Sequence, residues 1–231
     1  MTEPTPPPAA GPSRLHDRPL LHNHPIAIRI AGVLLTLGSL LFIALAIPAT
    51  AEWVQRVDEA VHRTVVDLEW APLVAVAKAL DFLGSTWFTL PIMVVVAAYL
   101  AWRNRWEALI TWVTAMMISQ LLIGPVKNLY ERPRPTLALV ATNGYSFPSG
   151  HAVATGAIAV ALVIVLVPAG ARRRTAEALA ILIVCVMAMS RVYLRAHWLT
   201  DALAGAVMGA GVAVIVAAVI HLMDDRRRSR L

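Results

Sequence analysis

The feature that most constrains this chain is a series of six long apolar runs, separated by shorter charged or proline-containing segments. The hydrocarbon core of a bilayer is about 30 Å thick, and a helix that rises about 1.5 Å per residue crosses it in about 20 residues. Apolar residues make up 58% of the chain and charged residues 15%, whereas soluble domains average about 45–50% and about 25%. The sequence therefore predicts an all-α polytopic membrane protein with six transmembrane helices, near residues 26–47, 86–102, 108–126, 152–167, 176–189 and 199–222.

The segments around these runs divide the chain into a membrane domain and two tails. Seven prolines among residues 1–25 predict a disordered tail. The membrane domain is expected at 26–222, with its core at 53–220, followed by a basic tail at 223–231. Residues 52–69 hold five acidic residues and favour an exposed helix, and residues 71–83 favour an interfacial or partly inserted helix that ends at Gly84 and Ser85. In the last run, Gly205 and Gly209 form a G-x-x-x-G motif, which predicts that a neighbouring helix approaches closely.

The arginines predict how the chain is oriented. If the N-terminus is inside, six spans place most of the basic residues on one side, and the positive-inside rule makes that side the cytoplasm. Both termini are then cytoplasmic, residues 52–69 face outward, and the protein is expected in the plasma membrane. No basic stripe interleaved with aromatic residues is present, so the bilayer rather than nucleic acid is the expected partner. The inner arginines are Arg14, Arg18, Arg29, Arg103, Arg105, Arg172, Arg173, Arg174, Arg226, Arg227, Arg228 and Arg230.

Three polar clusters remain on the predicted outer side, where topology gives no reason for cations. They lie at 127–135, after the third span, at 148–151, before the fourth, and at 190–201, between the fifth and sixth. Taken alone, Lys127 could extend from a helix end to the interface, Ser149 could cap the fourth helix, and Arg134 could contact lipid headgroups. His197 and Asp201 could be a helical i, i+4 pair without chemistry. Together, the clusters indicate an anion site with acid–base capacity.

The same residues suit phosphoryl transfer, which depends on positioning and on neutralising the phosphoryl oxygens. Arg134 and Arg191 offer planar two-pronged donors, and Lys127 adds a point charge. The free N–H groups of Ser149 and Gly150, where the fourth helix is expected to begin, favour an anion.

A nucleophile and a proton donor are present as well. If residues 197–201 are helical, Asp201 shares a face with His197 and can fix the imidazole tautomer. One ring nitrogen would then be free to attack, and Asp201 would stabilise the charged phosphohistidine. His151 remains as the proton donor to the leaving oxygen.

These residues resemble the signature of the type 2 phosphatidic acid phosphatase (PAP2) family, K-x6-R-P, P-S-G-H and S-R-x5-H-x3-D, with each element complete and in order. Roughly residues 53–220 resemble the membrane core of the family. The resemblance extends to bacterial members of the phosphatidylglycerophosphate phosphatase B type. It implies six transmembrane helices and a histidine phosphatase that needs neither metal nor cofactor. The implied lipid phosphate substrates are phosphatidylglycerophosphate, phosphatidic acid and undecaprenyl diphosphate. The implied roles are phosphate binding by Lys127, Arg134, Ser149, Gly150 and Arg191, with His197 as nucleophile, Asp201 as its orienting partner and His151 as acid.

Two arginines lie outside this pattern. Arg132 precedes a proline two residues before the Arg-Pro pair of the signature, and the spacing from Lys127 selects Arg134 as the phosphate ligand. Arg195 stands two residues before His197, where many relatives have a small residue. Two roles are open for Arg195, contact with the second phosphate of a diphosphate substrate and contact with lipid at the interface.

Three other functions could use the same residues. A phosphotransferase would pass the same phosphohistidine group to a lipid or sugar, and the signature does not encode the acceptor. A lipid or anion transporter would use the cations alone and would need no nucleophile–acid pair. A metal-dependent hydrolase would use His151, His197 and Asp201 as ligands, but three adjacent cations would repel a divalent ion. Hydrolysis of lipid phosphates is the prediction, and the oligomeric state is left open.

Overall fold

The computed structural model describes residues 24–168 and 170–228, and this part of the chain is helical and contains no strand. The predicted all-α class is therefore confirmed. Residues 1–23, which make up most of the predicted tail, lie outside the described residues. The helices are α1 (His24–Ala46), α2 (Pro48–Asp67), α3 (Ala71–Gly84), α4 (Thr86–Trp102), α5 (Trp106–Tyr130), α6 (Gly150–Leu166), α7 (Ala171–Tyr193) and α8 (Leu199–Arg228).

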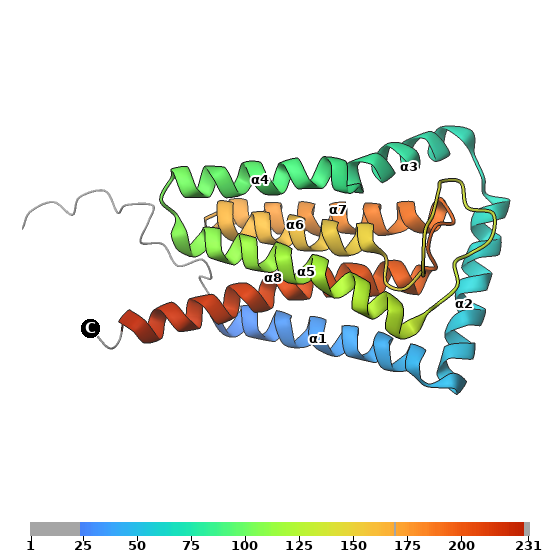
Figure 1. The fold of residues 1–231 in the computed structure, drawn as a ribbon, viewed down its shortest axis with the longest axis horizontal. Coiled ribbons are helices and arrows are strands. Elements are labelled where there is room, and N and C mark those ends of the chain that lie inside the picture. The colour runs from blue at the N-terminus through green and yellow to red at the C-terminus, as the bar shows by residue number, and fades with distance from the viewer. Residues whose placement is uncertain (1–23, 169, 229–231) are drawn as a thin grey trace, which may run out of the picture.

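The long helices lie side by side in a bundle, and α2 crosses one end of it (Figure 1). In the centre, α6 packs against α5, α7 and α8. Its small and branched residues are mostly buried, and Val153, Ala157 and Ala161 are each 0% exposed. The surrounding helices turn large apolar side chains outward, such as Leu121 and Ile181, which are 67% and 63% exposed. Such a surface is expected where lipid replaces water.

Glycines allow α8 to pack directly on the backbone of α6. A Cβ atom added to Gly205 would lie 2.6 Å from the Ser149 carbonyl oxygen, and one added to Gly209 would lie 2.1 Å from that of Val153. The predicted close approach at the G-x-x-x-G motif is confirmed. Because α6 begins beside the third polar cluster, this contact also positions its N-terminus against the first turns of α8.

The helices α3 and α4 form one apolar segment that bends by 46°. Ser85 interrupts it with an extended backbone (φ −71°, ψ 158°), and its hydroxyl donates to the Phe82 carbonyl at 2.7 Å. The Ser85 carbonyl then accepts from the Thr89 N–H at 2.9 Å, so a new helix starts at once. The predicted end of this segment at Gly84 and Ser85 is confirmed, and α3 continues α4 toward the end that α2 crosses (Figure 1).

Several described helices can cross a membrane. By length and composition α1, α5, α7 and α8 qualify, and the α3–α4 pair makes a fifth candidate. The central helix α6 is apolar but has only 17 residues. These helices support a multi-pass membrane protein, while the count of six stays a prediction.

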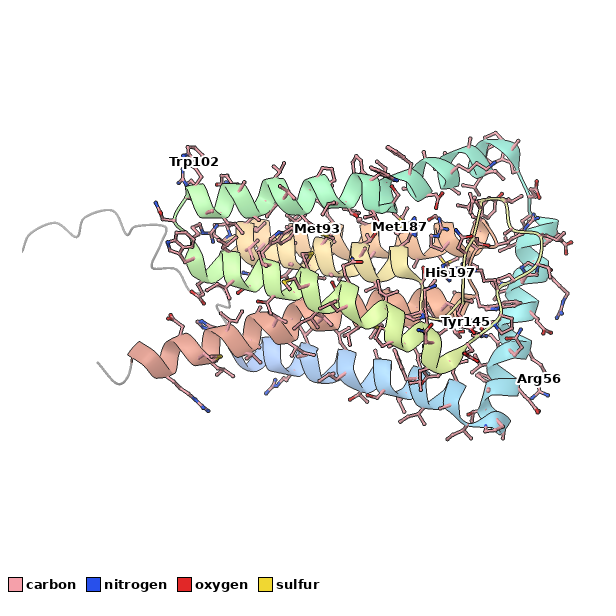
Figure 2. All side chains as sticks on the ribbon, in the orientation of Figure 1. Arg56, Met93, Trp102, Tyr145, Met187 and His197 are labelled. Carbon is pink, nitrogen blue, oxygen red and sulfur yellow. The ribbon has the colours of Figure 1, made fainter. Side chains whose placement is uncertain are left out.

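The two ends of the bundle carry different residues. Arg103 and Arg105 stand in the turn between α4 and α5, at the end opposite α2, close to the labelled Trp102 (Figures 1 and 2). His197 and Tyr145 lie at the α2 end (Figure 2). The first turn of α7, with its three arginines, and the last turns of α8 also lie at the end away from α2. The arginine clusters and the predicted catalytic residues are thus separated by the length of the bundle.

Two predicted segments differ in detail from the structure. Residues 52–69 form the helix α2 and its continuation, and four of the five acids are exposed, but Asp58 is only 1% exposed. It is buried because Arg132 and Thr200 hydrogen-bond to its carboxylate. The last helix also continues beyond residue 222 to Arg228, because charged residues do not interrupt a helix that leaves the apolar layer.

Candidate active site

The loop between α5 and α6 carries the first cations across the α2 end of the bundle. Helix α5 ends at Tyr130, and Glu131 adopts a left-handed backbone with φ 44°. The prolines at 133 and 135 then prevent a helix from continuing, since proline lacks an N–H donor and restricts the residue before it. Arg134 is therefore presented from an extended loop rather than from a helix.

Arg134 lies between this loop and His197. Its Nη1 atom is 3.3 Å from the His197 Nε2 atom. Lys127, in the last turn of α5, approaches the same place, because its Nζ donates to the Tyr145 carbonyl, which also accepts from Arg134. Two of the predicted phosphate-binding cations are thus neighbours. The guanidinium of Arg134 is held by the backbone oxygens of Asn143 (2.9 Å), Gly144 (2.9 Å), Tyr145 (3.2 Å) and Ala196 (2.6 Å).

His197 lies just before α8, not on a helix with Asp201 as was predicted. The helix begins at Leu199, and Asp201 in its first turn accepts a hydrogen bond from the Trp198 N–H at 2.9 Å. The same carboxylate oxygen, Oδ2, is 3.6 Å from the His197 Nδ1 atom. The expected pair is therefore present, but a capping interaction at a helix N-terminus forms it rather than a shared helical face.

The surroundings of His197 favour a neutral ring with one free nitrogen. Asp201 lies on the Nδ1 side, so the hydrogen of the neutral ring is assigned to Nδ1 and the lone pair to Nε2. Burial lowers the pKa of His197 to about 4, while Asp201 opposes this shift and the charges of Arg134 and Arg191 add to it. His197 is uncharged at neutral pH, as a nucleophile must be.

Ser149 and Gly150 begin α6 at the same end. Ser149 occupies the N-cap position, yet its hydroxyl makes no capping hydrogen bond, so capping does not explain this side chain. Its Oγ atom is buried and has no hydrogen-bond partner within residues 24–168 and 170–228. The Ser149 N–H donates to the Asp201 carbonyl at 3.0 Å, which ties the start of α6 to α8. A buried hydroxyl without a partner, beside a helix N-terminus, suits an anion.

His151 and Arg191 meet at Asp81 of α3, which sequence reasoning missed. The His151 Nε2 atom is 3.2 Å from the Asp81 Oδ1 atom and 3.1 Å from the Asp81 carbonyl oxygen. Arg191 Nη1 donates to the same Oδ1 atom. Both neighbours of Nε2 are acceptors, so this nitrogen carries the hydrogen and Nδ1 holds the lone pair of the neutral ring. The only sequence signal was a lone acid, three residues after Lys78, within a mostly apolar stretch.

The predicted residues thus converge at one end of the bundle in two groups. One surrounds His197, and the other joins His151 to Arg191 through Asp81. The groups are connected, because the Arg191 carbonyl accepts from the His197 N–H at 3.3 Å. The convergent residues are Lys127, Arg134, Ser149, Gly150, His151, Arg191, His197 and Asp201.

Arg132, which the spacing from Lys127 excluded as a phosphate ligand, contacts carboxylates and does not lie with Lys127 and Arg134. Its Nη1 donates to Asp201 Oδ1 at 2.6 Å and its Nη2 to Asp58 Oδ2 at 2.7 Å. The repeated Arg-Pro pair was the signal that could have directed attention to it.

Arg195 does not extend toward His197. Its guanidinium contacts the Glu69 carboxylate and donates to the Leu137 carbonyl at 3.3 Å, and the residue is 5% exposed. These contacts support neither of the two roles expected for it.

A recess of about 270 Å³ leads to the second group. Its lining is mixed. The apolar side chains are those of Leu90, Met93, Ile123 and Ala154, the polar ones are those of Thr86, Thr89, Gln120 and His151, and Gly84 and Gly150 complete it. A wider groove of about 520 Å³, between α1, α2 and α5, contains Arg132 but none of the predicted catalytic residues. Among the described residues, no group of three or more His, Cys, Asp or Glu side chains is placed to hold a metal ion.

Known proteins are similar to this chain in both sequence and fold. Residues 108–225, which include the eight convergent residues, match the PAP2 superfamily. The chain is 30% identical over 176 residues to phosphatidylglycerophosphatase B of Bacillus subtilis (strain 168), covering 74% of this chain and 86% of that protein.

Two solved structures are similar. The crystal structure of the first transmembrane PAP2 type phosphatidylglycerolphosphate phosphatase from Bacillus subtilis has a TM-score of 0.71 at 28% identity, covering 85% of this chain and 96% of that one. Aquifex aeolicus LpxE shares the fold, with a TM-score of 0.56 at 22% identity over 67% of this chain and 91% of that one. With the apolar helices, these similarities support a multi-pass membrane phosphatase. The chain belongs to the PAP2 superfamily.

Proposed function

We propose that this protein hydrolyses lipid phosphates through a phosphohistidine formed on His197, without a metal ion. The setting of His197 supports this most directly. Its Nδ1 is 3.6 Å from Asp201 Oδ2, and its Nε2 is 3.3 Å from Arg134 Nη1. A carboxylate at one ring nitrogen and a cation beside the other suit a nucleophile that attacks an anionic phosphate.

In the first step, His197 Nε2 attacks phosphorus, and the N–P bond forms as the bond to the leaving oxygen breaks. The ring becomes positively charged, and Asp201 stabilises that charge. Lys127, Arg134 and Arg191 neutralise the phosphoryl oxygens, as electrostatic catalysis of this reaction requires. The N–H of Gly150 at the start of α6 assists them, whereas the N–H of Ser149, predicted to be free, is already bound to the Asp201 carbonyl.

His151 handles the protons in both steps. As its Nε2–H is directed at Asp81, the ring acts as acid in its doubly protonated form. Nδ1 then gives its proton to the leaving alkoxide, which leaves the ring neutral. The neutral ring then accepts a proton from water, whose oxygen attacks phosphorus as the N–P bond breaks. Inorganic phosphate leaves, and His197 is regenerated.

The substrate class rests on the recess beside His151 and on the relatives. The recess combines apolar side chains, such as Leu90 and Met93, with polar ones, such as Gln120, and so suits a phosphate that carries acyl or prenyl chains. The B. subtilis relatives are named for phosphatidylglycerophosphate. We propose phosphatidylglycerophosphate, phosphatidic acid and undecaprenyl diphosphate as candidate substrates.

For the topology we propose six spans: α1, the bent α3–α4 pair, α5, α6, α7 and α8. The short α6 is acceptable as a span because protein surrounds it, so its ends need not match the lipid layer. With the arginine-rich end inside, both termini are cytoplasmic and the candidate active site faces outward at the plasma membrane.

The test is phosphate release by purified protein from the three lipids, with and without EDTA. Activity should survive EDTA, should be inhibited by vanadate and should be lost in His197→Ala. Glu59→Gln, which changes an exposed acid on α2, serves as the control and should be fully active. Activity lost in EDTA and restored by magnesium or zinc would replace this mechanism with a metal-assisted one. Transfer of the phosphoryl group to a lipid or sugar, in place of release, would make the protein a phosphotransferase.

A further inference from the structure

We infer that Asp58 and Arg132 form a second layer of the catalytic machinery, in which Arg132 positions Asp201 and Asp58 keeps the layer negatively charged toward His197. Both are positioning residues, and neither belongs to the signature that led to the site. The inference rests on the proposed phosphohistidine mechanism and assigns a catalytic role to the helix α2.

The three side chains form one buried array behind His197. Arg132 Nη1 donates to Asp201 Oδ1 at 2.6 Å, and Nη2 donates to Asp58 Oδ2 at 2.7 Å. The side chains of Asp58 and Asp201 are 0% exposed, and that of Arg132 is 9% exposed. Thr200 joins the two ends, because its N–H donates to Asp58 Oδ1 at 3.0 Å and its hydroxyl contacts both Arg132 and Asp58.

Arg132 determines which oxygen of Asp201 faces the nucleophile. It binds Oδ1, while Oδ2 accepts from the Trp198 N–H and the Ser146 hydroxyl and lies 3.6 Å from His197 Nδ1. With both oxygens held, the carboxylate cannot rotate away from the imidazole. Outer contacts of this kind orient the groups that do the chemistry.

Asp58 makes the net charge of the array negative. Arg132 and Asp201 alone would be neutral as a pair, and a neutral pair would stabilise a cationic ring weakly. With Asp58 on the other side of the guanidinium, the array of two carboxylates and one cation carries a net negative charge. That charge faces His197, whose ring becomes positive when its Nε2 bonds to phosphorus.

A purely structural role, anchoring α2 to the bundle, is the competing explanation. Buried ion pairs seldom add net stability over apolar residues of similar size, so stability alone does not account for an arginine between two carboxylates. The two explanations differ in the catalytic step that they affect. Anchoring would alter substrate binding and thermal stability, whereas the charge would alter the rate at which the phosphohistidine forms.

The test compares Asp58→Asn with Asp67→Asn, the same change at an exposed position of α2. The readouts in detergent are the rate of p-nitrophenolate release from p-nitrophenyl phosphate in a single turnover, kcat, KM, inhibition by vanadate and the Tm. Asp58→Asn should lower the single-turnover rate and kcat about 10–100-fold, the usual loss for an outer orienting partner. KM and vanadate inhibition should stay at the wild-type values, because the phosphate-binding cations are untouched. Asp67→Asn should match the wild type, and Asp58→Glu should recover activity.

A second comparison separates charge from folding. Asp58→Glu keeps the negative charge beside Arg132 and Asp58→Asn removes it, while both leave the contact between Arg132 and Asp201 in place. A folded Asp58→Glu protein whose kcat is no higher than that of Asp58→Asn would overturn the charge argument. Wild-type kcat in Asp58→Asn, or a loss shared with KM, vanadate inhibition and Tm, would overturn the whole inference. The absence of acid-labile phosphate on His151→Ala, in which hydrolysis of the intermediate is slow, would instead reject the phosphohistidine mechanism itself.

Discussion

A methyl group added at Gly205 should displace the phosphate-binding end of α6. Its Cβ would lie 2.6 Å from the Ser149 carbonyl oxygen and 3.1 Å from the Ala152 Cβ, whereas ordinary contact begins at 3.4 Å. The two backbones must therefore separate by about 0.8 Å. A backbone oxygen cannot rotate aside as a flexible side chain can, so the start of α6 has to move.

This movement should be visible in the rate. The Ser149 N–H donates to the Asp201 carbonyl at 3.0 Å, so Gly205→Ala disturbs the register between the start of α6 and the proposed nucleophile His197 beside α8. A misplacement of about 1 Å can cost about 100-fold in rate, and we expect a fall in kcat of about that size. Gly211→Ala on the same helix is the matched control, because its Cβ would meet only the Leu34 Cβ, at 3.8 Å. It should keep the wild-type kcat, since alanine is the better helix former.

The assay is p-nitrophenyl phosphate hydrolysis by both variants in detergent, with the Tm measured on the same samples. Wild-type kcat in a folded Gly205→Ala protein would refute the reasoning, because the rate would then not depend on the exact position of the start of α6. Gly209→Ala provides a second check one turn further along, where the Cβ would lie 2.1 Å from the Val153 carbonyl oxygen. It should be at least as damaging. Equal losses in Gly211→Ala would indicate a general effect on α8.

The roles of the histidines, the pH dependence and the orientation are open to separate tests. His197→Ala should abolish turnover of every substrate. His151→Ala should still release a burst of p-nitrophenolate, because this leaving group needs little protonation. Acid-labile phosphate should accumulate on that variant as turnover falls about 10²–10⁴-fold. Phosphate bound to the His197 variant alone would show that the two roles are reversed. With the pKa of His197 lowered to about 4 by burial, the neutral nucleophile persists on acidification, so kcat/KM, corrected for substrate ionisation, should fall only near pH 4. A fall in kcat/KM near pH 6.5 that is caused by protonation of His197 would contradict this. A cysteine replacing Glu59 should react with an impermeant maleimide in intact cells and one replacing Arg173 should not; the opposite labelling would reject the outer-face assignment.

Sequence reasoning found the core of the candidate site because its signals are local. The spacing of Lys127 from Arg134 and the order of Ser149, Gly150 and His151 can be read without knowing how the helices pack. The apolar runs likewise predicted the long helices, because a bilayer demands a set length of apolar chain. The break at Ser85 was predicted from another local signal, the Gly84-Ser85 pair that ends the apolar segment.

The partners of these residues could not be found in this way. Asp81 meets Arg191 across 110 residues, and Asp58 meets Arg132 across 74. No periodicity links such distant positions, and an acid on an amphipathic helix looks solvated until its neighbours are known. The expectation that His197 shares a helix with Asp201 failed because the spacing alone does not show where a helix begins.

The sequence by itself determined the all-helical class, the long apolar helices and the residues that we propose to bind and attack a phosphate, because hydrophobic length and chemical type belong to the residues themselves. Only the tertiary structure decided that Ser149 Oγ is buried without a hydrogen-bond partner among the described residues, that Arg132 faces Asp58 and Asp201, and that α6 packs on the glycines of α8. Burial, charge pairing and close backbone contact depend on which helices become neighbours, and packing settles that.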